Sequence, residues 1–296
     1  MSAAVANISF DTLTELTEGR FGGLDIPCPE CSTWAGRSSN GRRRRVFRVW
    51  REHPDLASYH CARCALSGFA RRIGARTRFD PQRLAQMKAE AAERAGDYAA
   101  GQLRKARWLW RRAVPPYGTI VERYLRHRAI AGRVPSTICY LPTSRPDRHP
   151  AMLAPYGMGT EYEPGEIEIA ESAICAVHLT FLKPDGSGKA DIDPAKITIG
   201  FPTAAPLVLA PMNDLLGLAI TEGIEDAISV HQETGLGAWA AGSWSFMPAL
   251  SHTVPDYANC VTIIADDDAD GLRGARELAY RLHHRGLHVE LIEPSS

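Results

Sequence analysis

The sequence lacks any apolar run that approaches the ~20 residues needed to span a membrane. Its first ten residues, MSAAVANISF, also lack the positive charge and the long apolar stretch of an export signal. Net charge is absent too, because 34 basic residues balance 34 acidic ones. We therefore expect a globular, cytoplasmic protein with no membrane partner, and 296 residues are enough for two or three domains.

An odd count of seven cysteines argues against a secreted disulfide framework. Four of them form two Cys-x-x-Cys pairs, Cys28 with Cys31 and Cys61 with Cys64. Such pairs can supply four thiolates to a tetrahedral zinc ion and tie distant chain segments together, whereas a pair of redox or free-thiol motifs is the alternative. The remaining cysteines, which lie in apolar runs, are interpreted as small core residues: Cys139, Cys175 and Cys260.

Positive charge is concentrated near the start of the chain. Residues 21–78 hold twelve arginines and four acidic residues, a ratio typical of proteins that bind a phosphate backbone. The densest run is Arg42, Arg43, Arg44 and Arg45, which we interpret as a DNA contact, with a solvated loop as the alternative. Interleaved aromatic residues suit stacking on single-stranded bases, although some must pack the core of a small domain: Trp34, Phe47, Trp50, Tyr59 and Phe69.

Residues 211–296 reverse this balance, with thirteen acidic residues against four arginines. Strand-like segments at 218–221, 237–241, 261–265 and 287–292 enclose helical patterns at 224–234 and 272–285, which predicts a parallel sheet with right-handed crossovers. Acidic residues follow two of these strands, at 222–226 and 266–270. Because ligands bind beyond the carboxyl ends of strands in such sheets, carboxylates from two strands are expected to meet at one rim.

The middle of the chain is predicted to form two further segments. Residues 79–133 predict a helical linker, with good helix formers from Pro81 to Arg112 and a second helix that begins at a Thr119–Glu122 capping box and ends near Gly132. Residues 134–210 alternate short strand-like runs with turns and predict an α+β segment. The metal-binding segment 1–78, which includes a short helix at 11–18, precedes these two segments, and the domain 211–296 follows them. The expected fold class is therefore α/β, in four parts.

Three sets of residues resemble known families. Glu222-Gly223-x-x-Asp226 after one strand and Asp266-x-Asp268-x-Asp270-Gly271 after another resemble the signatures of the Toprim fold, a Rossmann-like parallel sheet found in bacterial primases, topoisomerases of types IA and II, and OLD-type nucleases. The two cysteine pairs resemble the zinc ribbon that precedes the catalytic core of bacterial and phage primases. The segment 177–189 resembles the core of short Toprim proteins related to plasmid and phage primases.

The resemblance implies a DNA primase, a nucleotidyltransferase that makes short RNA primers on single-stranded DNA from nucleoside triphosphates. Asp266 and Asp268, supported by Asp270, would hold Mg²⁺ or Mn²⁺ through hard oxygen ligands. By resemblance, Glu222 is the acid/base or a further metal ligand, and Asp226 shares the metals. The four cysteines would hold a structural zinc.

Lys183, Lys189 and Lys196 precede the acidic motifs in the chain. They are candidates for binding the triphosphate or the template, because they supply the charge opposite to that of the substrate, and ordinary surface lysines are the alternative. Since the sequence stops after the last expected strand, any replicative helicase is expected to be a separate protein.

Three alternatives stay open. A Toprim nuclease would use the same metals to cut nucleic acid, and a non-catalytic zinc-ribbon protein would bind DNA as the partner of a replication protein. The aspartate run, with Glu277 at its twelfth position, also fits the calcium loop of an EF-hand. An EF-hand needs a helix before the loop, however, and the β-branched run 261–264 predicts a strand there.

Overall fold

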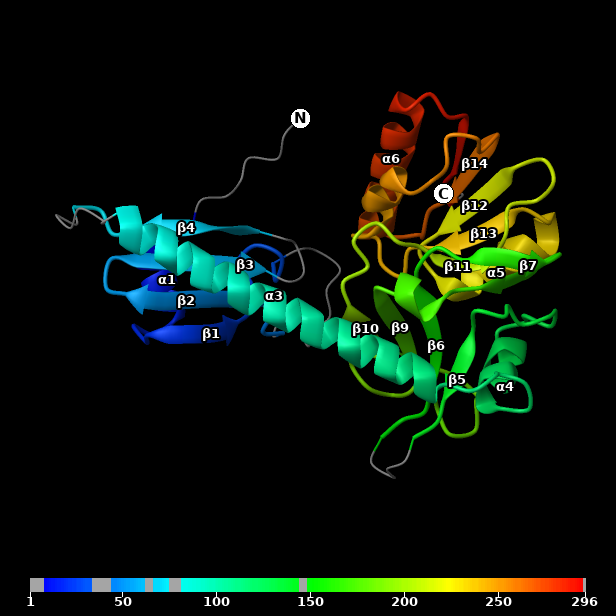
Figure 1. The fold of residues 1–296 in the computed structure, drawn as a ribbon, viewed down its shortest axis with the longest axis horizontal. Coiled ribbons are helices and arrows are strands. Elements are labelled where there is room, and N and C mark those ends of the chain that lie inside the picture. Colours follow the sequence, from blue (N-terminus) through cyan, green and yellow to red (C-terminus); the bar gives the residue numbers. More distant parts are fainter. Residues whose placement is uncertain (1–7, 34–43, 62–65, 75–80, 144–147, 295–296) are drawn as a thin grey trace. The chain divides into compact units, whose positions relative to one another are not determined.

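The computed structural model describes residues 8–33, 44–61, 66–74, 81–143 and 148–294 (Figure 1). The chain divides into two compact units, residues 1–88 and 89–296, and each is described by itself. The boundary falls within the long helix α3 (Pro81–Arg112), which covers the range predicted for it. None of the helices within these ranges is both long and apolar enough to cross a membrane.

The N-terminal unit is built on a four-stranded antiparallel sheet. Its strands lie in chain order: β1 (Gly22–Ile26), β2 (Phe47–His53), β3 (Leu56–Cys61) and β4 (Ser67–Arg71). Helix α1 (Phe10–Leu16) overlaps the predicted helix and begins at Ser9, whose hydroxyl accepts a hydrogen bond from the Thr12 N–H. Phe10 and Leu13 of α1 pack with Phe47 and Tyr59 of the sheet in a small apolar core. This core also contains Cys28, Cys31 and Cys61.

Helix α4 (Ile120–His127) belongs to the core of the C-terminal unit. It begins at the predicted cap, where the Thr119 hydroxyl accepts a hydrogen bond from the Val121 N–H and the Glu122 carboxylate accepts one from the Gly118 N–H. It ends before the predicted limit near Gly132, because the chain turns at Ala129, whose φ is 62°. Its apolar face is buried, so this part of the predicted linker is packed against the sheet of its own unit.

The C-terminal unit contains a nine-stranded mixed sheet with the order β10-β9-β6-β11-β13-β12-β14-β15, and β5 pairs with β6 (Figure 1). The strands are β5 (Cys139–Leu141), β6 (Ala151–Tyr156), β9 (Ala176–Phe181), β10 (Lys196–Gly200), β11 (Leu207–Ala210), β12 (Gly217–Thr221), β13 (Gly237–Ala240), β14 (Cys260–Ile264) and β15 (Val289–Ile292). The part β13-β12-β14-β15 is parallel, as predicted for the last eighty residues. The strands of residues 139–210 extend the same sheet in antiparallel fashion, so the predicted boundary at residue 211 separates two halves of one sheet.

Helices α5 (Ile224–Thr234) and α6 (Ala269–His284) lie on opposite faces of the parallel strands. Side chains alternate along β13, so that Trp239 packs in the core under α6, whereas Ala238 and Ala240 pack in the core under α5. Helix α5 stops where predicted, because Gly235 adopts the left-handed conformation with a φ of 68°. The remaining elements are a hairpin of β7 (Thr160–Glu163) and β8 (Glu166–Glu168) and the short helices η1 (Glu171–Ala173) and η2 (Met247–His252).

Candidate metal and nucleic-acid site

Four carboxylates gather where two neighbouring parallel strands end, and we call them the acidic rim. Strand β12 pairs in parallel with β14, Glu222 directly follows β12, and Asp266 lies two residues after β14. Asp226 is in the first turn of α5, and Asp268 is the N-cap of α6. Both strands therefore deliver their acidic residues to the same end of the sheet, which is the arrangement that the sequence predicts.

Two glycines allow these carboxylates to approach the backbone. A side chain at Gly223 would overlap the Asp226 carboxylate, which folds back over the start of α5. A Cβ at Gly271 would come 2.8 Å from the Cβ of Asp266. The Gly271 N–H in turn donates a hydrogen bond of 2.7 Å to Oδ1 of Asp268, which caps α6. The glycines of both motifs thus have a steric role in shaping the acidic rim.

Burial and neighbouring negative charges raise the pKa values of two rim carboxylates, Glu222 and Asp266. Burial, followed by the charges of Asp266 and Asp268, raises the pKa of Glu222 to about 7, although the Trp244 N–H donates a hydrogen bond to its carboxylate. Burial, together with the charges of Asp226 and Asp268, likewise raises the pKa of Asp266. Without a cation, like charges are therefore held together at this rim.

This donor set fits a divalent cation. Carboxylate oxygens are the ligands that Mg²⁺ prefers, and a bound cation would offset the charge repulsion that, after burial, raises the pKa values of Glu222 and Asp266. In the described ranges, no three of the rim carboxylates place an oxygen within 4.8 Å of one another. These side chains would consequently have to move slightly toward one another to bind a shared ion.

Two lysines lie next to the acidic rim. The exposed Lys196, which begins β10, interacts electrostatically with Glu222, Asp266 and Glu225. Lys189 is half-buried, and its Nζ lies 3.1 Å from Oε1 of Glu225. Burial lowers the pKa of Lys189, and the charge of the neighbouring Lys196 adds to this effect. Basic and acidic groups thus adjoin one another at one end of the sheet.

Two further residues of the C-terminal unit were predicted to belong to the site, and each forms an ion pair with another residue. Lys183 forms an ion pair of 3.1 Å with Asp191. Asp270, in the first turn of α6, forms an ion pair of 2.9 Å with Arg273. The EF-hand alternative is wrong, because the strand β14 precedes the aspartate run and Glu277 lies within α6, where it pairs with Arg281.

Sequence reasoning missed a buried polar network that involves Lys189 and Lys196. The carboxylate of Glu225 is buried and accepts a hydrogen bond from the hydroxyl of Tyr124 on α4. Burial alone would raise the pKa of Glu225, but the charges of Lys196 and Lys189, with the Tyr124 hydrogen bond, lower it to about 2. A signal existed, because Glu225 lies three residues before Ile228, which places both on the same face of a helix.

His178 is a second residue that the sequence reasoning did not select. It lies in the middle of β9, opposite Thr198 of β10, with Thr180 on the same face opposite Lys196. Nδ1 of His178 and Oγ1 of Thr180 are buried and have no hydrogen-bond partner among the residues that the structure describes. Burial, with a smaller contribution from Lys196, lowers the pKa of His178 to about 4, so this imidazole is neutral. The available signal was a pair of polar residues two apart within an apolar run.

The N-terminal unit brings three of the predicted zinc ligands together. Cys28 and Cys31 follow β1, Cys61 ends β3, and all three are fully buried. Their sulfur atoms lie within 4.8 Å of one another, and those of Cys31 and Cys61 are 3.8 Å apart. The fourth predicted ligand, Cys64, lies outside the described residues. Three clustered soft donors in a small core fit a zinc ion, so this is a candidate zinc site.

The basic residues of this unit have different surroundings. Arg42 and Arg43 lie outside the described residues, Arg45 is exposed, and Arg44 is half-buried. Arg51 is buried, with its guanidinium over the rings of Phe10 and Phe21, so it lies inside the fold and is not an exposed basic residue. The aromatic residues divide in the same way: Phe47 and Tyr59 are core residues, whereas Phe69 is 61% exposed.

The other three cysteines were predicted to be core residues, but none of them is fully buried, and of the three Cys175 packs against the apolar core that contains α4. Cys139, Cys175 and Cys260 are each only half-buried. The Cys175 thiol donates a hydrogen bond to the carbonyl oxygen of Tyr156. The sulfur of Cys260 lies within 4.8 Å of ligand atoms of His288 and Glu290.

Comparisons with known proteins agree with the position of the acidic rim. Residues 100–208 match a domain of unknown function (DUF7146), and residues 217–296 match the Toprim domain. Searches of curated proteins and of solved structures gave no match. The Toprim match covers β12 and β14 and all four residues of the acidic rim. Residues 217–296 are therefore a Toprim domain, a domain that is found in enzymes such as primases and nucleases and that binds divalent metals such as Mg²⁺.

Proposed function

We propose that this chain is a primase-type nucleotidyltransferase that synthesises short RNA primers on single-stranded DNA. The observation that carries the proposal is the meeting of the acidic rim with Lys189 and Lys196 at one end of the sheet. A nucleoside triphosphate with its divalent cations presents positive metal ions beside negative phosphates. Adjacent acidic and basic groups match that distribution of charge.

Each residue of the site has a role in this proposal. Glu222, Asp266 and Asp268 would hold Mg²⁺ or Mn²⁺, with Asp226 as a further ligand and Asp270 supporting them. When bound, these ions neutralise the charge that develops as a 3′ hydroxyl attacks the α-phosphate and pyrophosphate leaves. Lys196 is exposed next to the rim and would bind the triphosphate. Glu225 orients Lys189 toward the same end of the sheet through their ion pair.

The N-terminal unit would hold the DNA template. A zinc ion bound by Cys28, Cys31, Cys61 and Cys64 would fix the turns that connect the strands of its sheet. Exposed basic and aromatic side chains such as Arg45 and Phe69 suit a single strand, because arginines contact phosphates and rings stack on bases. Lys183, which pairs with Asp191, is proposed as a more distant contact for the template.

The direct test is incubation of the full chain with single-stranded DNA, labelled ribonucleoside triphosphates and Mg²⁺ or Mn²⁺. Short labelled RNA whose formation requires the DNA supports the proposal. Metal-dependent degradation of the DNA without RNA synthesis would replace it with a Toprim nuclease. Binding of DNA with neither reaction would favour a non-catalytic zinc-ribbon partner of a replication protein.

A further inference from the structure

Three metal-binding side chains meet at the edge of the sheet formed by β14 and β15. Cys260 begins β14, His288 directly precedes β15, and Glu290 lies within β15. The two strands are parallel with Thr262 opposite Glu290, so alternation places Cys260, His288 and Glu290 on one face. One ligand atom of each residue lies within 4.8 Å of the other two.

We propose that Cys260, His288 and Glu290 form a binding site for a transition-metal ion such as Zn²⁺. A thiolate, an imidazole and a carboxylate are the three side-chain ligands that zinc takes in proteins. Ligands of a tetrahedral zinc at roughly 2.0–2.3 Å from the ion lie about 3.5 Å apart, so the observed spacing closes with small side-chain rotations. The acidic rim differs in chemistry, because its donors are all oxygen atoms.

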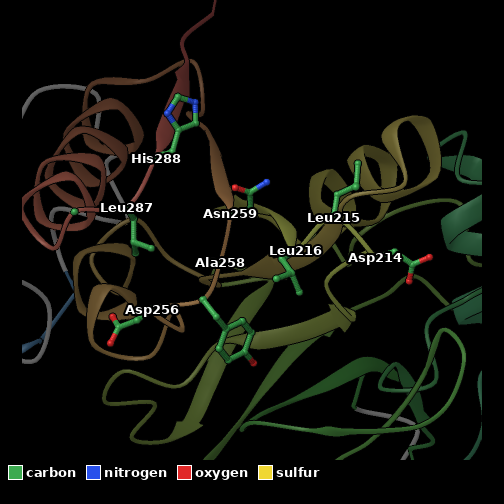
Figure 2. A pocket seen from close by; sticks show the side chains of 10 residues that line it. Asp214, Leu215, Leu216, Asp256, Ala258, Asn259, Leu287 and His288 are labelled. Carbon is green, nitrogen blue, oxygen red and sulfur yellow. The ribbon is translucent and has the colours of Figure 1, made fainter.

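The proposed site lies at the opposite end of the strands from the acidic rim. Cys260 is the first residue of β14, whereas Asp266 follows the last residue of that strand. His288 also borders an open pocket of about 540 Å³ on this side of the unit, together with Asn259 and Asp256 (Figure 2). The site therefore does not belong to the catalytic machinery proposed above.

Exposure at the site favours an exchangeable ion. His288 and Glu290 are exposed and Cys260 is half-buried, so an ion can enter from solvent. Three protein ligands leave a fourth coordination position, which is typical of zinc sites that keep water or a small molecule as a ligand.

A bound ion would strengthen the edge of the sheet. Strand β15 is the last strand on its side, and Ile292 at its end is 51% exposed. An ion bound by Cys260 of β14 and by His288 and Glu290 would hold β15 and β14 together. Because the folded chain alone presents the three ligands together, binding would stabilise the folded C-terminal unit, and this stabilisation would grow with the logarithm of the metal concentration.

The test is a Co²⁺ titration of the full chain, purified with zinc in its N-terminal unit and kept in excess Mg²⁺ to occupy oxygen-only sites. We expect one Co²⁺ per chain with a sulfur-to-cobalt absorption band, and a melting temperature that rises with Co²⁺ or Zn²⁺. Cys260→Ser and His288→Ala should each remove the band and the thermal shift. Glu290→Gln should weaken binding by about tenfold or more.

The matched control is Cys175→Ser, which changes a half-buried cysteine outside the cluster. It should keep the band, the stoichiometry and the metal-dependent melting temperature. Absence of the band in the wild-type chain would overturn the proposal. So would a band that persists in Cys260→Ser, because the thiolate would then come from another cysteine.

Discussion

The Lys189 ammonium lies 3.1 Å from the Glu225 carboxylate, and this ion pair joins a half-buried lysine to a buried acid next to the Toprim acidic rim. Tyr124 donates a second hydrogen bond to Glu225, so helix α4 also contributes to the network. The Glu225 carboxylate therefore orients Lys189 and Tyr124, whereas Glu222 and Asp226 of the same motif belong to the acidic rim. Neighbouring acids in one motif thus have different tasks.

Breaking this ion pair should destabilise the C-terminal unit. Glu225→Gln leaves the Lys189 charge without its counter-charge, and because about one-third of Lys189 is exposed to water, we expect a loss of about 1–3 kcal/mol in unfolding free energy. The double variant with Lys189→Met should recover part of it, since no unpaired charge remains. Urea unfolding followed by circular dichroism measures both. Equal stability of Glu225→Gln and wild type would show that the pair contributes nothing.

His178 should make the C-terminal unit less stable in mild acid. Its pKa is about 4 in the folded chain and 6.5 in the unfolded one, so the unfolded state binds more protons in this interval. The unfolding free energy should therefore fall by about 3 kcal/mol as the pH drops from 6.5 to 4, in addition to the effect of carboxyl groups. His178→Asn should lack this component, and the exposed His252→Asn should keep it. Urea unfolding across this pH range tests the difference.

Periodic patterns allowed the parallel half of the fold to be predicted from sequence. Strands such as Gly217–Thr221 are mostly apolar and buried at every residue because both faces are covered, and Gly235 marks the end of α5 by its left-handed conformation. The acidic residues could be placed because they directly follow these strands. The antiparallel half was less predictable, since short strands such as Leu207–Ala210 acquire their neighbours only through pairing distant in sequence.

The buried polar network could not be derived from composition. Helical spacing places Glu225 on the same face as Ile228, but it is the packing of α5 that buries Glu225 and leaves the adjacent Asp226 exposed. Cys260 shows the reverse case, because an apolar flanking sequence predicts a core residue, yet its position at a strand start beside β15 leaves it half-buried. Both outcomes depend on which elements become neighbours.

The three clustered cysteines predict one tightly bound zinc ion per chain. Cys28→Ser or Cys61→Ser should remove it and unfold the N-terminal unit, because metal binding supplies much of the stability of so small a core. Elemental analysis after dialysis against a mild chelator, which clears exposed sites, measures the zinc. Cys139→Ser, outside the cluster, should retain it. Zinc-free wild-type protein with a folded N-terminal unit would contradict the assignment.

The basic run predicts binding of single-stranded DNA that weakens with salt. Each arginine–phosphate contact releases counterions, so replacing Arg42, Arg43, Arg44 and Arg45 with Gln should reduce the slope of log K against log salt by up to about 3. The control replaces Arg276 and Arg281, which pair with Glu293 and Glu277 on the C-terminal unit. Fluorescence anisotropy at several salt concentrations gives the slopes. An unchanged slope would make the run a solvated loop.

Replacement of single carboxylates at the acidic rim should abolish catalysis and leave the fold intact. Glu222→Gln and Asp268→Asn each remove one charge needed to hold divalent cations, so primer synthesis should fall by at least about a hundredfold. Asn at position 268 keeps the oxygen that accepts the Gly271 N–H, so α6 retains its cap, and DNA binding and zinc content should stay unchanged. The control is Asp267→Asn, an exposed acid in the same loop. Wild-type rates in both rim variants, measured on correctly folded protein, would place the catalytic site elsewhere in the chain.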